Sequence, residues 1–210
     1  MRRFANILFL CVFLCVFLAG AARGEAEVQL TLADVVDRLG ESAVIRGSYT
    51  QTREIALLSK PLESHGDFIL SEQGLFWRQQ SRPASIVIAN SDRLVQQIGD
   101  GIPEVSDESS NPMVLPFSRI FLGIFTGDEE SLRTHFEIAF STTGEVWEIV
   151  LTPTTEPMSL AIETIILQGR EYIEDLTVVN RSSDQTVIRF SDIQTQPEHL
   201  TEHEIELYAR

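Results

Sequence analysis

Apolar residues recur at a helical period near the start of the chain and then change to the period of β-strands. Thr31 and Asp34 stand at the spacing of a capping box. The apolar residues that follow one helical face are Leu32, Val35, Val36 and Leu39. We therefore expect a short amphipathic helix that ends near Gly40.

Ten short segments rich in β-branched and aromatic residues come next, separated by turn residues. They form two groups of five, at 44–55, 65–71, 74–80, 84–90 and 93–99, and at 136–141, 145–153, 160–167, 172–180 and 185–193. Because the first five follow one another without a helical pattern, they predict an antiparallel meander, and hairpin turn residues indicate the same for the second group. The tail after residue 193 is polar and predicts no clear element.

The stretch "MVLPFSRIFLGIF", residues 113–125, separates the two groups and is too short to span a bilayer, which takes about 20 apolar residues. Prolines near its start and helical spacing of its large apolar side chains predict a helix. A second short helix is expected in residues 127–136, where acidic residues stand at the N-terminal end. The predicted class is α+β: one curved antiparallel sheet of about ten strands, with helices against one face.

The N-terminal segment predicts that the protein is exported to the periplasm. Residues 1–24 have a basic start, an apolar run and small residues, which predicts a signal peptide cleaved after Ala21 or Gly24. A retained membrane anchor over residues 4–22 is the alternative; a lipoprotein signal is excluded, because "VFL" precedes Cys15. Residues 25–210 then form one domain without cysteine, and the net charge changes from −15 to −18 with the loss of three arginines. Nucleic acid is not an expected partner of so acidic a chain.

The sequence contains no convincing catalytic constellation, so we expect neither an enzyme nor a cofactor. "HLTEH", His199–His203, fits the zinc motif H-x-x-E-H, but only seven residues follow it and the tail is acidic. His65 and His135 are expected at the surface or at element ends. What remains is an excess of apolar residues on the early strands, which either pack against the apolar helix as a core or enclose a site for a lipid.

The order of motifs resembles the LolA family of periplasmic outer-membrane lipoprotein carriers, over residues 31–193. Tyr49 and Gln51 fit an F-x-Q strand, residues 66–68 a G-x-(L/F) strand, residues 75–78 an L-F-x-W-like strand and residues 91–92 a turn. "IFLGIFTGDEESLRTHFEIAF" resembles the apolar helical insert of the family, and "WEIVLTPTTEPMSLAIETIIL" its next strand pair. Two family features are absent: Glu72-Gln73 stands where an Arg-Pro latch is usual, and the C-terminal F-x-P-P-x-G strand is missing.

The resemblance implies an incomplete β-barrel of about eleven strands whose concave side is closed by helices. It implies a monomeric periplasmic shuttle that takes acylated lipoproteins, or another lipid, from an inner-membrane ABC transporter to an outer-membrane acceptor. An envelope sensor on the same half-barrel is the alternative. The residues expected to form the lipid-binding cavity and its lid are Phe68, Leu70, Leu75, Trp77, Ile86, Ile88, Leu115, Phe117, Ile120, Phe121 and Ile124.

Overall fold

A computed structural model describes residues 30–90, 93–106, 122–123 and 129–209. Eleven antiparallel strands form one sheet in the order β6-β5-β4-β3-β2-β1-β11-β10-β9-β8-β7. The first six are β1 (Val44–Glu54), β2 (Leu62–Ser71), β3 (Gly74–Gln79), β4 (Ser85–Ala89), β5 (Leu94–Ile98) and β6 (Glu104–Ser106). The others are β7 (Phe136–Thr143), β8 (Val146–Pro153), β9 (Ile162–Gly169), β10 (Ile173–Asn180) and β11 (Gln185–Gln194).

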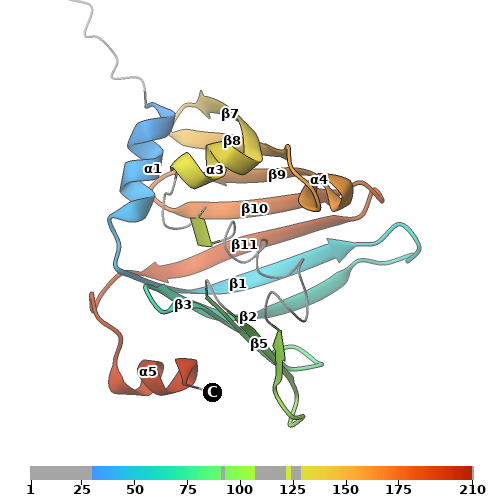
Figure 1. The fold of residues 1–210 in the computed structure, drawn as a ribbon, viewed down its shortest axis with the longest axis vertical. Helices are drawn as coiled ribbons and strands as arrows, with labels where there is room; N and C mark the ends of the chain where they lie inside the picture. Colours follow the sequence, from blue (N-terminus) through green and yellow to red (C-terminus); the bar gives the residue numbers. More distant parts are fainter. Residues whose placement is uncertain (1–29, 91–92, 107–121, 124–128, 210) are drawn as a thin grey trace, which may run out of the picture.

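Two meanders make up this sheet, and they meet where β1 pairs with β11. In each meander, strands that are neighbours in sequence are neighbours in space. The pairing of β1 with β11 runs from Arg46 opposite Gln194 to Glu54 opposite Gln185. Strands β6 and β7 are the two edges of the described sheet, which is curved and does not close into a barrel (Figure 1). The predicted class, curvature and strand number are confirmed.

The described residues also form the helices α1 (Leu32–Gly40), α3 (Glu129–His135), α4 (Met158–Ala161) and α5 (Glu202–Tyr208). Helix α1 begins as the sequence predicts, with Thr31 and Asp34 in a reciprocal capping box. Helices α1, α3 and α4 lie along the upper strands in Figure 1, and α5 lies at the lower end of the molecule beyond β2 and β3. Helices therefore cover both faces of the sheet, whereas the sequence predicted them on one.

Side chains of the strands divide into two apolar clusters because successive residues of a strand point to opposite faces. We call the face that carries the larger cluster the inner face; helices α1, α3 and α4 contribute to it. The smaller cluster, on the outer face, joins strands β1 to β5 to the C-terminal helix α5. No helix in the part of the chain that the structure describes is long and apolar enough to cross a bilayer.

Candidate functional site

The inner face is apolar across nearly the whole width of the sheet. Its buried residues come from β1 to β4, from β7 to β11, and from helices α1, α3 and α4. In the second meander they include Trp147, Ile149, Leu151, Ile165, Leu167, Leu176, Ile188 and Phe190. Partly buried residues such as Val178, Ile138 and Phe140 pack against them. The buried apolar residues therefore form one continuous cluster across the sheet.

Three aromatic residues on this face each have a glycine as their direct partner on the neighbouring strand. Tyr49 is directly opposite Gly66, Phe68 opposite Gly47, and Trp147 opposite Gly169. A Cβ atom added at Gly47 would lie 2.8 Å from Phe68 Cε1, one at Gly66 2.9 Å from Tyr49 Cε1, and one at Gly169 2.8 Å from Trp147 Cζ2. The glycines therefore leave the room in which these rings lie against the sheet.

An aromatic cluster occupies the inner face where the two meanders meet. The Tyr49 and Trp77 rings are stacked with centroids 3.7 Å apart, and Phe68 lies edge-on to Phe190 at 5.2 Å. Trp77 also meets Phe190 edge-on at 6.3 Å, so the cluster joins β1, β2, β3 and β11. Such pairs fix the orientation of each ring and add to the stability gained from burial alone.

The hydroxyl group of Tyr49 is buried in this cluster without a hydrogen-bond partner in the part of the chain that the structure describes. The residue is 1% exposed. Burial, which disfavours the charged phenolate, raises the pKa of Tyr49 to about 12, and a hydrogen bond that the Trp77 side chain can offer to the phenolate opposes the shift in part. The hydroxyl is therefore protonated at any physiological pH and can donate a hydrogen bond.

Residues 41–202 match the family model described as outer membrane lipoprotein carrier protein LolA. The chain belongs to the LolA family. No curated protein sequence matches it. The resemblance seen in the sequence is thereby confirmed.

The solved structures that match this chain include proteins from three bacteria. A DUF1329 family protein from Desulfovibrio piger has a TM-score of 0.47 and 10% identity, with 81% of this chain and 92% of that chain covered. A LolA superfamily protein from Nitrosomonas europaea has a TM-score of 0.46 and 7% identity over 83% and 97% of the two chains. A putative outer membrane lipoprotein-sorting protein domain from Vibrio parahaemolyticus has a TM-score of 0.45 and 10% identity over 85% and 97%.

In this LolA-family protein the cavity residues predicted from the early strands separate into two sets. The inner face holds Phe68, Leu70, Leu75 and Trp77. Ile86 and Ile88 belong to the outer cluster instead, which corrects their assignment to the same surface. The register explains the correction: Trp77 pairs with Val87, so the residues on either side of Val87 point to the opposite face.

The predicted lid lies outside the described residues, and this includes Leu115, Phe117, Ile120, Phe121 and Ile124. Two residues of the segment, Leu122 and Gly123, are described. Leu122 is partly buried and packs against the inner-face cluster. This contact puts one apolar residue of the 113–125 segment on the surface that the lid was expected to cover.

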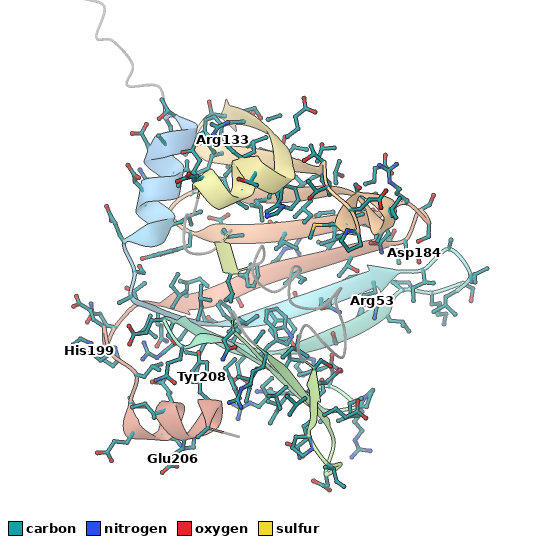
Figure 2. All side chains as sticks on the ribbon, viewed as in Figure 1. Arg53, Arg133, Asp184, His199, Glu206 and Tyr208 are labelled. Atoms are coloured by element: carbon teal, nitrogen blue, oxygen red, sulfur yellow. The ribbon has the colours of Figure 1, made fainter. Side chains whose placement is uncertain are left out.

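Helix α5 covers the outer face and was not predicted from the polar tail. Tyr208 is buried there; its hydroxyl donates to the carbonyl oxygens of Ile69 (2.9 Å) and Gly74 (3.1 Å) and accepts from Ser71 Oγ (3.3 Å). Figure 2 shows Tyr208 on the side of the helix that faces the strands. The helix therefore seals the second apolar face.

An ion pair fixes the start of the same helix to β1. Arg46 donates from Nε to Glu204 Oε1 and from Nη2 to Glu204 Oε2, the latter at 2.9 Å, and the side chains are each 13% exposed. Glu204 also forms the capping box of α5 with Thr201. The hydrogen bond from Arg46 is the main reason that the pKa of Glu204 falls to about 2.

The structure gives no support to the zinc alternative. Helix α5 starts at Glu202, after its N-cap Thr201, so His199 precedes the helix while His203 lies on it, and both are exposed. The two histidines therefore do not share a helical face. Among the described residues no group of His, Cys, Asp and Glu side chains could hold a metal ion.

Exposed apolar side chains lie at one end of the sheet, in and beside the connections between strands. They are Leu57, Leu58 and Leu62 around the β1–β2 connection, Ile98, Ile102 and Val105 around the β5–β6 connection, and Leu160 on α4. We call this end the apolar rim. The backbone N–H of Ala56 donates to Asp184 Oδ1 at 2.9 Å, which ties the β1–β2 connection to the β10–β11 turn and lowers the pKa of Asp184. Arg53 and Asp184 lie at this end in Figure 2.

Proposed function

We propose that this protein is a periplasmic carrier that binds the acyl chains of lipoproteins, or of another lipid, on the inner face of its sheet. The observation that carries the proposal is the continuous apolar inner face of a sheet that does not close. Membership of a family described as lipoprotein carriers supports the same class of cargo. No catalytic step is part of this function.

The energetic need for a carrier follows from the chemistry of the cargo. Each methylene group taken out of water is worth about 0.8 kcal/mol, so a sixteen-carbon chain resists crossing an aqueous space by roughly 12 kcal/mol. A carrier has to offset most of this amount and still release the chain. An apolar surface shared by the cargo and a movable part of the protein meets both needs, because loading and unloading then exchange one apolar contact for another.

We propose segment 113–125 as that movable part. In the empty protein its apolar residues, Leu115, Phe117, Ile120, Phe121 and Ile124, would cover the inner face and give way to acyl chains. The contact of Leu122 with the inner-face cluster supports this assignment. Residues 1–24 would direct export and be removed. An inner-membrane ABC transporter would load the carrier, and an outer-membrane acceptor would unload it.

Uptake of a fluorescent sixteen-carbon fatty acid by purified protein tests the proposal, and β10 offers a matched pair of variants. Val178 lies on the inner face and Val179, the next residue, on the opposite face; both are half-buried. We expect Val178→Asp to weaken binding at least tenfold, because a carboxylate would have to be desolvated beneath the chain. Val179→Asp introduces the same charge on the same strand and should change affinity less than twofold.

Thermal unfolding of both variants shows whether the sheet is intact. Equal effects of the two substitutions on uptake, or wild-type protein that takes up no fatty acid, would contradict the proposal. Transfer of the bound probe to acceptor vesicles then separates a carrier from an envelope sensor, because a sensor would bind the lipid without passing it on.

A further inference from the structure

The two buried tyrosines, Tyr49 and Tyr208, differ in the hydrogen bonds that their hydroxyl groups make. Tyr208, on the outer face, makes three hydrogen bonds through its hydroxyl group. Tyr49, on the inner face, is more deeply buried at 1% exposure, and its hydroxyl oxygen has no hydrogen-bond partner in the described part of the chain. A buried polar group without a partner destabilises the fold, and phenylalanine would avoid that loss at the same position.

The Tyr49 hydroxyl is also held in place. The ring lies against Gly66, whose missing Cβ leaves room for it, and stacks on Trp77 at 3.7 Å. A ring packed on one side by a strand and on another by an indole cannot swing its hydroxyl out to solvent without breaking both contacts. The result is a fixed, neutral donor set into an apolar surface.

The chemistry of this donor limits what can satisfy it. A pKa of about 12 keeps the hydroxyl protonated, so it retains a proton that it can donate to an acceptor. An anionic acceptor such as a carboxylate would carry a large desolvation penalty in an apolar cluster. A neutral carbonyl oxygen attached to a hydrocarbon chain fits both conditions, since its chain occupies the apolar surface while its oxygen accepts the hydrogen bond.

We propose that Tyr49 is the polar anchor of the inner face, where its hydroxyl donates a hydrogen bond to the carbonyl oxygen of an ester-linked or amide-linked acyl chain. This inference rests on the proposed function and adds a specificity to it. The inner face would select acyl chains over alkyl chains of the same length. Tyr49 would also set the depth at which the carbonyl group stops.

Two lipids that differ only in the carbonyl group test the anchor. We would measure displacement of a fluorescent fatty acid by 1-palmitoylglycerol and by 1-O-hexadecylglycerol, which have the same headgroup and a sixteen-carbon chain joined by an ester or an ether. Wild-type protein should bind the ester about five- to tenfold more tightly. Tyr49→Phe should reduce the ratio to about one by weakening the ester alone.

Tyr208→Phe is the matched control, because it removes a buried hydroxyl from the opposite face, and it should leave the ester-to-ether ratio unchanged. The lipid-free proteins give a second readout. Tyr49→Phe should unfold at the same or a higher temperature than the wild type, whereas Tyr208→Phe should unfold at a lower one.

The outcomes separate this inference from the function on which it rests. If neither lipid displaces the probe from wild-type protein, the proposed function fails and the anchor with it. If both lipids bind and Tyr49→Phe leaves their ratio unchanged, the anchor alone is overturned. A loss of stability in lipid-free Tyr49→Phe would also overturn it, because the hydroxyl would then have a partner inside the protein.

Discussion

Arg46 and Glu204 join the first strand to the last helix across the outer face. Their ion pair is bidentate, and Arg46 also donates to the carbonyl oxygens of Pro197 (2.9 Å) and His199 (3.0 Å). One side chain therefore holds the segment before α5 and the first turn of α5 itself. The Arg46–Glu204 pair is therefore the main polar attachment of the C-terminal segment to the sheet.

Glu204→Gln is expected to lower the free energy of unfolding at pH 7 by about 2 kcal/mol, because Arg46 loses its charged partner while the fold is kept. The folded-state pKa of Glu204 is depressed to about 2 from its ordinary value of 4.5. A depressed pKa gives stability that is present above pH 4.5 and is lost as the pH falls toward 2.

Urea unfolding of the wild type and the variant at pH 7 and at pH 2.5 measures both parts of this prediction. The difference between the two proteins should shrink at pH 2.5, because Glu204 of the unfolded wild type is protonated there and most of the stability that comes from the depressed pKa is lost. Glu206→Gln, at an exposed position on the same helix, is the control and should have little effect at either pH. A difference that stays constant with pH would contradict the role assigned to the ion pair.

At this scale the sequence predicts which positions are apolar better than it predicts which face of the sheet each apolar side chain occupies. In "SIVIA", residues 85–89, apolar side chains are continuous, so alternation does not show whether Ile86 and Ile88 or Val87 face inward. The register with β3 decides it, and that register depends on the turn geometry. The missing partner of the Tyr49 hydroxyl is likewise a property of packing, which no local pattern contains.

At the scale of elements, the glycines opposite Tyr49, Phe68 and Trp147 explain how large rings fit on a tightly paired sheet. Glycine in a strand normally weakens it. Here each one receives the ring of its direct cross-strand neighbour, an arrangement that stabilises glycine in sheets. The smooth apolar inner face therefore depends on small residues as much as on large ones.

Gly47→Ala tests this dependence. The new Cβ would lie 2.8 Å from Phe68 Cε1, 2.9 Å from Ile193 Cδ1 and 3.0 Å from the Ser191 carbonyl oxygen, so the Phe68 ring would have to move. We expect a loss of about 1–3 kcal/mol in the free energy of unfolding, as for other overpacked sites. Near-UV circular dichroism should change as well, because the aromatic cluster is disturbed.

Ser48→Ala is the control for Gly47→Ala, because it alters the next residue of β1, which points to the other face. It should change the free energy of unfolding by no more than about 0.5 kcal/mol. If the two substitutions lower the free energy of unfolding by the same amount, the position of the Phe68 ring does not depend on Gly47.

Elements with a clear apolar period were predictable, and those without one were not. All ten predicted strands are confirmed. The eleventh strand, β6, was not predicted, because its three residues are too few to show a period. Helix α5 was missed because the tail is rich in acids. The signal was present all the same: Thr201 and Glu204 have the spacing of Thr31 and Asp34, and both pairs form capping boxes.

At the scale of the whole molecule, the two faces of the sheet differ in how they are closed. The outer face is sealed by a helix with an ion pair and a buried tyrosine, which commit it to one structure. The inner face is broader and contains a polar group without a partner in the described chain. This asymmetry is what a carrier needs, since only one face has to exchange its contacts with a cargo.

The apolar rim should then govern how fast a lipid arrives and not how tightly it is held. Leu57, which is 95% exposed, stands outside the inner-face cluster and can touch an acyl chain only on its way in. We expect Leu57→Asp to slow transfer of a fluorescent fatty acid from vesicles to the protein several-fold, while the equilibrium affinity changes less than twofold. Ile205→Asp adds the same charge at an exposed position of α5, beside the sealed outer face, and should leave both quantities unchanged. Stopped-flow transfer measurements on the wild type and the two variants test this route, and equal rates for the two variants would exclude a path over the apolar rim.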